Sequence, residues 1–564
     1  MNNKKRFTTL ILVFALLTAL LLSGCGSEDS DLPQDETPSD LLLGEPVTGK
    51  LPEGDLLTIN YAPEESVNPL SGTGSTNALL TNLIYETPFT VGTDYTFAPT
   101  RLIKEFEFYD EGKTWSFTVD TSVQFSDGTY LSAYDVAYSV RRAMQSSLYR
   151  SRLDNNSIVY GVSAISDEVF MISLHQENML FPALLTIPVI RNGDYNVRCP
   201  IGTGLYKMEG AELWNGLPED EDDADENEGD GESGEATEPE PVQPRLVLNS
   251  LHPSAASAMI PEIRLRESGG MDNMVADFED GYIDLLVNDP TGFSAMGFGS
   301  ANEVRSYISP SMYYLGFNMG HDFVLTAQYR YAMNFLIDRK TIVQKLMFGS
   351  GVEAVSPVVP TSPYCDRSIE DVIHYSPEAA LTAFANSGCA DHDDDGKLEY
   401  MVTGIPMEIR LKFIVNGENS VKVSIARSIA EELRSIGITV ELHEMPWNDY
   451  VTALEEGEFD IYLGEVMLTA DFNLSALLRE DDPLNYGGIT DPGYIARIDE
   501  YLAADDTQRA VACSNMCQYI VANSPIIPIA FEGRELVTHR GVLTGIELSP
   551  YNVFLNIQDW KLNN

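Results

Sequence analysis

The cysteine at position 25 is the residue whose surroundings most clearly predict a chemical modification. It follows Leu22-Ser23-Gly24 at the end of an apolar run that starts at Leu10, and Lys4, Lys5 and Arg6 precede that run. A positively charged N-terminal segment, a short apolar run and small residues before a cysteine form the pattern of a bacterial lipobox. The run is too short to span a bilayer stably. We expect residues 1–24 to be a signal peptide and Cys25 to carry a lipid; an ordinary signal peptide with a chance cysteine is the alternative.

This prediction places the mature protein at the cell membrane, lipid-anchored on its extracytoplasmic face. ATP and NADH are not available there, which removes most classes of enzyme. The net charge of −51 repels nucleic acid and anionic lipid headgroups. We therefore expect no nucleic-acid partner and contact with the membrane through the lipid anchor alone.

Motifs for catalysis or for a bound cofactor are missing from the sequence. It contains no G-x-S-x-G, H-E-x-x-H or P-loop pattern, and its seven histidines are scattered. Five further cysteines lack the C-x-x-C spacing of a zinc site; they are Cys199, Cys365, Cys389, Cys513 and Cys517. If a disulfide forms, we expect it between Cys365 and Cys389, with buried free thiols as the alternative. We expect no enzymatic activity, no cofactor and no metal site.

One acidic segment, Asp391-His392-Asp393-Asp394-Asp395-Gly396, resembles the start of a calcium-binding loop. An EF-hand also needs a bidentate glutamate at loop position 12, and that position is Val402 here. The missing ligand favours a polar surface turn over a calcium site.

Two other acidic stretches indicate segments outside any packed core. Residues 25–54 are acidic and contain prolines, which is typical of a flexible stalk. Residues 219–240 carry thirteen acids and no base. Because such a run has nothing apolar to bury, we expect a disordered insertion at 216–244.

The elements between these stretches alternate between strand and helix. Residues 408–415 alternate apolar and polar side chains, as a strand does, and apolar residues then recur at helical spacing over 421–436. Gly437 ends that helix, and a second strand follows at 438–442. This is a βαβ unit with an expected right-handed crossover. Further patterns predict a helix and a strand at 447–456 and 459–463, strands at 55–61 and 113–119, and a helical stretch from Asn68 to Ile84. The fold class is α/β.

Several segments, taken in order, resemble one family. They are Val123–Gly128 with Leu131–Val136 ("v-x-F-s-D-G … l-t-A-x-D-V"), Ile201–Tyr206, Phe278–Asp284, Leu315–Asn318, Tyr329–Asn334 and Gly457–Ile461. Together they are similar to the extracellular solute-binding proteins of peptide/nickel-type ABC importers. The similarity runs from about Leu56 to Trp560, and the acidic insertion is not a feature of that family.

The resemblance implies a two-lobed periplasmic-binding-protein-like fold of the large, class II peptide-binding type, with a hinge and an interlobe cleft. Lobe 1 would comprise residues 55–316 and, after the chain returns, 529–564; lobe 2 would comprise 317–528. The chain would cross near Phe317 and recross at 526–529, where Pro528 suits a crossing strand better than a helix. We expect a monomer.

The resemblance also implies a binding site. In the peptide-binding branch, an aspartate in a "W-x-x-D-y" segment pairs with the amino terminus of the peptide, and Asp471 is the matching residue. Leu468 stands where the family has tryptophan. The alternative role for Asp471 is the N-cap of a helix that begins near Asn473. Tyr61 is a second cleft candidate, with packing at its strand end as the alternative, and we expect Trp447 to pack at the start of its helix.

We therefore expect a substrate-binding lipoprotein that captures short peptides by hinge closure. It would deliver them to a permease and ATPase complex. A metal chelate, a sugar or an opine-like ligand remains an alternative, as does a surface sensor that uses the same fold without transport.

Overall fold

The computed structural model describes residues 56–563 apart from 73, 75, 155, 212–214, 216–243, 293–300, 322, 324 and 325. The expected signal peptide, Cys25 and the stalk lie outside these described residues, as does all of the expected insertion except Pro244. Within the described parts, no helix has the length and apolar character needed to cross a membrane.

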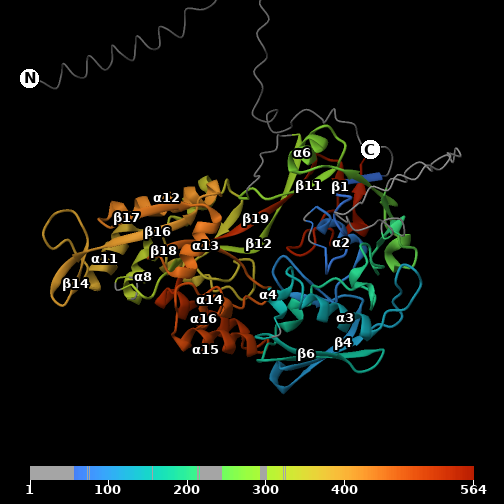
Figure 1. Ribbon diagram of the computed structural model, residues 1–564, viewed down its shortest axis with the longest axis horizontal. Coiled ribbons are helices and arrows are strands. Elements are labelled where there is room, and N and C mark those ends of the chain that lie inside the picture. Colours follow the sequence, from blue (N-terminus) through green and yellow to red (C-terminus); the bar gives the residue numbers. More distant parts are fainter. Residues whose placement is uncertain are drawn as a thin grey trace, which may run out of the picture. The chain divides into compact units, whose positions relative to one another are not determined.

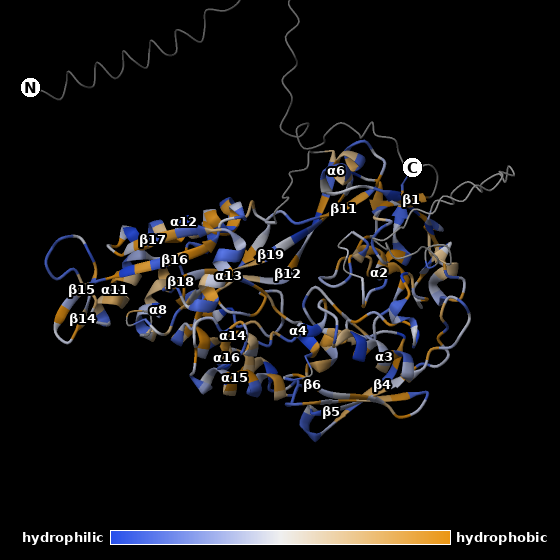
Figure 2. Ribbon diagram, in the orientation of Figure 1, coloured by the Kyte–Doolittle hydropathy of each residue, from blue (hydrophilic) through white to orange (hydrophobic). Residues whose placement is uncertain are grey.

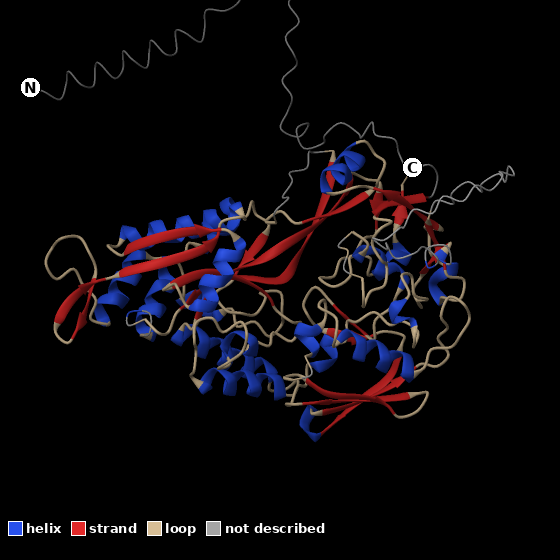
Figure 3. Cartoon of the chain, viewed as in Figure 1, coloured by secondary structure: helices blue, strands red, loops and turns tan. Residues whose placement is uncertain are grey.

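Two four-stranded sheets are built mainly from the first half of the chain (Figure 3). One has the order β1-β10-β9-β8, with β1 (Leu56–Tyr61) parallel to β10 (Glu262–Glu267), and β9 (Arg245–Leu248) and β8 (Tyr206–Glu209) antiparallel. The other is antiparallel with the order β4-β5-β7-β6; these are Ile103–Tyr109, Thr114–Val119, Val169–Leu174 and Val159–Ala164.

Helix α3 (Ala133–Ala143) packs on β6 and β7 of the second sheet. Its start is fixed by a capping box. The Asp135 amide donates to the Ser132 hydroxyl, and the Ser132 amide donates to the Asp135 carboxylate at 2.8 Å. Such a box satisfies amide groups that have no partner inside the helix, which explains why the helix begins there.

A seven-stranded sheet contains two long neighbouring strands, β12 (Asn302–Phe317) and β19 (Ile526–His539) (Figure 1). Its order is β11-β19-β12-β18-β16-β17, and β13 (Gly351–Glu353) also pairs with β19. The other strands are β11 (Leu285–Asn288), β16 (Arg410–Asn416), β17 (Thr439–Met445) and β18 (Ile461–Met467).

The βαβ unit predicted from the sequence is present in this sheet. Strands β16 and β17 are parallel and are joined by α12 (Ser420–Ser435). Gly437 adopts a φ of 94°, a conformation that glycine takes without strain, so the helix ends where predicted. Helix α13 (Trp447–Glu456) then leads to β18, again as predicted.

The remaining α-helices and three two-stranded pairs lie outside these sheets. The helices are α2 (Ala78–Ile84), α4 (Arg150–Leu153), α6 (Met271–Glu279), α8 (Ala327–Met333), α9 (Arg339–Thr341), α10 (Ser368–Val372), α11 (Pro377–Asn386), α14 (Ser475–Leu478), α15 (Pro492–Ala503) and α16 (Arg509–Asn523). The two-stranded pairs are β2 (Phe89–Val91) with β3 (Phe97–Pro99), β14 (Glu399–Val402) with β15 (Ile405–Glu408), and β20 (Leu543–Thr544) with β21 (Lys561–Leu562).

The helical stretch expected from Asn68 to Ile84 is shorter in the structure. Only Ala78–Ile84 is helical. The Asn68 side chain accepts hydrogen bonds from the amides of Leu70 and Ser71, at 3.0 and 3.3 Å. This local bonding favours a turn over a helix, and the apolar spacing alone did not reveal it.

Buried apolar side chains form two large clusters. One is drawn from residues 57–285 and 536–560, and the other mainly from 312–531. Hydrophobic residues follow β16 and β18 in the second cluster (Figure 2). Met312 in β12 and Phe531 in β19 already belong to the second cluster, whereas Leu536 belongs to the first. The two long strands thus connect the clusters, and the exact lobe boundaries remain a prediction.

The five described cysteines are all free thiols, so the expected Cys365–Cys389 disulfide is not formed. Cys365 is half-buried beside Cys517, whereas Cys389 lies against the hydroxyl of Tyr329. The two cysteines therefore have different neighbours, and the alternative of buried free thiols describes them better.

Candidate functional site

Asp471 lies in a tight turn between β18 and α14. The turn is closed by the amide of Phe472, which donates to the Thr469 carbonyl at 2.9 Å, and Phe472 has a φ of 51°. The amide of Ser475 donates to the Asn473 side chain, and Asp471 makes no capping bond to α14. The structure therefore does not support the alternative that Asp471 is the N-cap of this helix.

The Asp471 carboxylate is buried among hydrogen-bond donors. The residue is 1% exposed. Its Oδ2 accepts from the side-chain amide of Asn178 at 2.9 Å, and its Oδ1 accepts from the Thr469 hydroxyl and the Asn473 amide. Burial raises the pKa of Asp471, although these bonds oppose the rise. No Lys, Arg or His of the described chain forms an ion pair with it. Asp471 is therefore a buried carboxylate that accepts hydrogen bonds but has no cation partner among the described residues.

Aromatic residues from distant parts of the chain meet next to the Asp471 turn. Phe472 contacts Tyr95 with ring centroids 5.1 Å apart, and Tyr95 contacts Tyr551 at 6.4 Å. Burial raises the pKa of Tyr551 to about 12; the Arg152 guanidinium, 5.7 Å from the centre of the ring, lowers it in part, and the Asp471 carboxylate raises it. Within the described chain, the buried hydroxyls of Tyr551 and Ser475 have no hydrogen-bond partner. Unpaired buried hydroxyls are costly, and a water molecule or a ligand group that reached them would complete their bonding.

The segment that supplies Asn178 makes further contacts with the region after β18. The Met179 amide donates to the Leu502 carbonyl at 2.8 Å. The Arg479 guanidinium reaches the Gln176 side chain at 3.5 Å. The Asn178 side chain also accepts from the Leu180 amide at 2.8 Å, which fixes its orientation. This segment and the region around Asp471 therefore form a polar seam.

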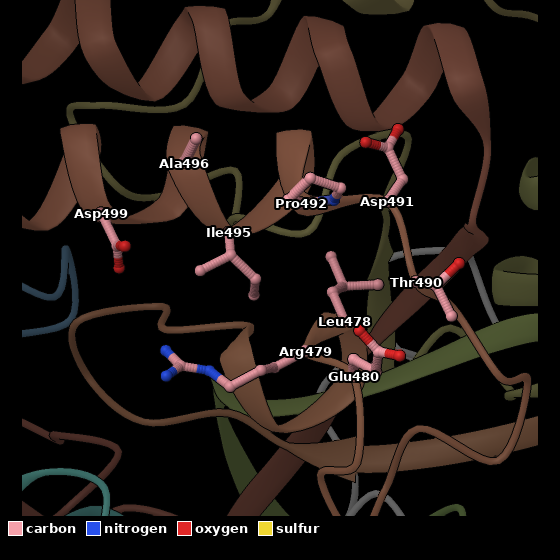
Figure 4. A pocket seen from close by; sticks show the side chains of 9 residues that line it. All are labelled: Leu478, Arg479, Glu480, Thr490, Asp491, Pro492, Ile495, Ala496 and Asp499. Carbon is pink, nitrogen blue, oxygen red and sulfur yellow. The ribbon is translucent and has the colours of Figure 1, made fainter.

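An open pocket of about 410 Å³ lies beside this seam, between the end of α14 and α15 (Figure 4). Charged side chains from both elements line it, among them Arg479 and Asp499, which the figure shows on the same side of Ile495. Burial raises the pKa of Asp499, and the charge of Arg479 lowers it in part. The pocket adds polar surface next to the seam but does not include Asp471.

The structure places the other predicted residues as follows. Leu468 is buried in the second cluster, and its backbone amide donates a hydrogen bond of 3.0 Å to the Pro310 carbonyl. Tyr61 is buried in the first cluster, at the end of β1 opposite Glu267. Burial raises the pKa of Tyr61, and Glu267 and Glu64 raise it further. Leu468 and Asp471 thus belong to one turn, whereas Tyr61 lies in a different core. Trp447 is the first residue of α13, as expected, and its ring contacts Tyr450, although it is 49% exposed and packs only in part.

Sequence reasoning missed Asn178, Tyr95 and Tyr551. Asn178 and Asp471 are 293 positions apart, and no local pattern marks an asparagine as the partner of a distant acid. The aromatic residues gave no signal either, because buried tyrosines are common in cores of this size.

A mixed α/β chain with two cores joined by long strands, and with a buried acid at a polar seam, is typical of two-lobed binding proteins. Residues 100–215 and 255–478 match the model of the bacterial extracellular solute-binding proteins, family 5 (Middle), and the chain belongs to that family. It has the two-lobed α/β fold of these proteins and is a solute-binding protein of the ABC-importer type.

Individual relatives are distant but match most of the chain. The oligopeptide-binding protein AppA of Bacillus subtilis is 22% identical over 81% of this chain and 80% of its own length. The nickel-binding periplasmic protein of Escherichia coli is 22% identical over 80% of this chain and 84% of its own length. The crystal structure described as a nickel ABC transporter from Bacillus halodurans superposes with a TM-score of 0.69 at 17% identity, covering 90% of this chain and 99% of that one.

Proposed function

We propose that this protein captures short peptides with a free amino terminus and delivers them to an ABC permease and ATPase complex. The peptide would lie between the lobes, with its α-ammonium paired to Asp471. The protein would act as a monomer held at the outer face of the cell membrane by a lipid on Cys25. It would release the peptide unchanged rather than act as an enzyme.

The observation that carries this proposal is the environment of Asp471. The carboxylate is fully buried, accepts three hydrogen bonds and has no cation partner in the described chain. A buried charge is costly unless it is paired, so an incoming ammonium group gains a strong partner there.

Hinge closure supplies the capture step. Asn178 and Asp471 come from distant segments that meet at the seam. A ligand that contacts both segments favours the arrangement in which they are together, because it binds that arrangement more tightly than a separated one. The unpaired hydroxyls of Tyr551 and Ser475 are further groups that a peptide backbone would satisfy.

Relatives named for oligopeptides and for nickel match this chain about equally well, so the ligand must be identified directly. Native mass spectrometry of the purified mature protein would give the mass of any ligand that remains bound. We expect masses of short peptides, confirmed by fragment sequencing. A metal-chelate or sugar mass would contradict the peptide proposal and support one of the alternatives.

Transport is tested separately from binding. A strain that depends on an imported peptide for growth should lose growth when this chain is removed and regain it when the chain is restored. Unchanged uptake of a peptide that the purified protein binds would favour the surface-sensor alternative.

A further inference from the structure

A loop between α11 and β14 gathers four carboxylates into a small space. One oxygen from each of Asp391, Asp393, Asp395 and Glu399 lies within 4.8 Å of the corresponding oxygens of the others. The loop is closed where Ala390 and Glu399 exchange backbone hydrogen bonds of 3.1 and 3.0 Å. It is part of the hydrophilic stretch beside β14 in Figure 2.

The backbone of the loop turns the aspartates inward. The Asp391 carboxylate accepts from the amides of Asp395 and Gly396, at 3.1 and 2.9 Å. Asp394 and Gly396 have φ values of 62° and 83°, which tighten the turn. The carboxylates of Asp391, Asp393 and Asp395 therefore converge. Asp394 is exposed and does not belong to the group.

Glu399 gives an independent indication that a cation belongs here. It is only 6% exposed, while the three aspartates are exposed. The one hydrogen bond that its carboxylate accepts in the described chain comes from the His392 amide to Oε2, at 2.7 Å, and the other carboxylate oxygen has no partner there. Lys397, two residues earlier, lies 3.8 Å from Glu408 instead. A largely buried carboxylate that faces three more acids, with no cation partner in the described chain, is unfavourable unless a positive ion joins them.

We propose that Asp391, Asp393, Asp395 and Glu399 bind a calcium ion. Calcium takes oxygen ligands at about 2.3–2.6 Å in flexible geometry, so ligand oxygens on opposite sides of the ion are up to about 5 Å apart. The separations in this loop fit that range. Magnesium is smaller and holds its water more firmly, so it should bind to a group of four carboxylates more weakly than calcium does.

The sequence expectation of a plain surface turn rested on Val402 at loop position 12. The structure shows why that position does not decide the matter. Glu399 occupies position 9, and its pairing with Ala390 brings it back to the aspartates. The ion would tie the end of α11 to the start of β14, next to Leu398 and Cys389 of the second core cluster.

Calorimetric titration of the metal-stripped mature protein with calcium chloride tests the proposal. We expect one saturable site in the range up to about 1 mM, typical of extracellular calcium modules, and a higher melting temperature when the site is filled. Asp393→Asn and Glu399→Gln should each weaken calcium binding at least about tenfold, since each removes one charged ligand. Magnesium chloride should bind at least about tenfold more weakly than calcium.

Asp394→Asn is the matched control. It removes the same charge from the same loop, and asparagine tolerates the positive φ at this position. A chain with a net charge of −51 attracts cations over its whole surface, and this control should retain the affinity of the unaltered protein within about twofold. If Glu399→Gln fails to fold, the exposed Asp393→Asn decides. The absence of a saturable site, or equal weakening by Asp393→Asn and Asp394→Asn, would overturn the proposal.

Discussion

The side-chain amide of Asn178 donates a 2.9 Å hydrogen bond to Oδ2 of Asp471, joining two buried residues that are 293 positions apart. The Asn178 amide occupies one of the acceptor sites that a ligand ammonium would use. The pair therefore links the seam between distant segments to the charge on which the proposed function depends.

Replacing Asn178 with aspartate would set two carboxylates against each other in a buried place. Both would resist ionisation, so their pKa values would rise. The folded state would then bind more protons than the unfolded state, and stability would fall as the pH rises. We expect Asn178→Asp to lower the melting temperature at pH 7 by several degrees and to recover much of the loss near pH 4. Asn196→Asp, at an exposed asparagine, should have little effect at either pH. Equal losses at both pH values would show that repulsion from Asp471 is not the cause.

Asp284 should give the protein a measurable pH dependence. Burial raises its pKa to about 6, and the bond from the Thr58 amide at 2.6 Å opposes the rise only in part. Because the folded pKa lies above the unfolded one, its contribution is fully present below about pH 4 and is lost as the pH rises to about 6. The free energy of unfolding of Asp284→Asn, relative to the unaltered protein, should increase over this window by up to about 3 kcal/mol. Urea unfolding at several pH values measures it. Asp280→Asn, at an exposed residue of the same turn, should show no such increase.

The acidic insertion should be dispensable for folding. Glu209 in β8 and Arg245 in β9 are direct partners in an antiparallel pair, so a short linker can join the chain near this point. Asn215 must be kept, because its side chain bonds both backbone groups of Cys199. Replacing residues 216–243 with a Gly/Ser linker should change the melting temperature by less than about 2 °C. A loss of several degrees, or of ligand affinity, would show that the insertion packs or acts.

The lipid anchor depends on Cys25, which lies outside the described residues. Cys25→Ala should leave the protein either unprocessed or free of the membrane, because the acylated thiol would be missing. Detergent-phase partitioning and the mass of the mature amino terminus check this. A Cys25→Ala protein that is processed normally and stays with the membrane would contradict the lipoprotein prediction.

The second half of the chain was predictable because its signals are local. The unit β16-α12-β17 follows from alternation, helical spacing and a glycine that ends the helix. The helical stretch from Asn68 was overestimated because a side-chain-to-backbone bond decides that turn, and apolar spacing does not report it.

The candidate site was predictable only in part. Asp471 was proposed from a motif, but Asn178, which donates to it, and Tyr551, on which its charge acts, come from distant parts of the chain. The same holds for the acidic loop, where counting to position 12 missed the buried Glu399. In both places the missing information is a contact between residues whose pairing depends on tertiary or sheet structure.

The most direct test of the account is a double cycle that alters Asp471 and the ligand amine separately. Calorimetry would compare a bound peptide with its N-acetylated form on the unaltered protein and on Asp471→Asn, with Asp481→Asn as an exposed control on a nearby turn. Each single change should cost about 3 kcal/mol or more, over a hundredfold in affinity, and the two together should cost scarcely more than one. Equal binding of the free and acetylated peptides, or fully additive losses, would contradict the pairing of the peptide amino terminus with Asp471.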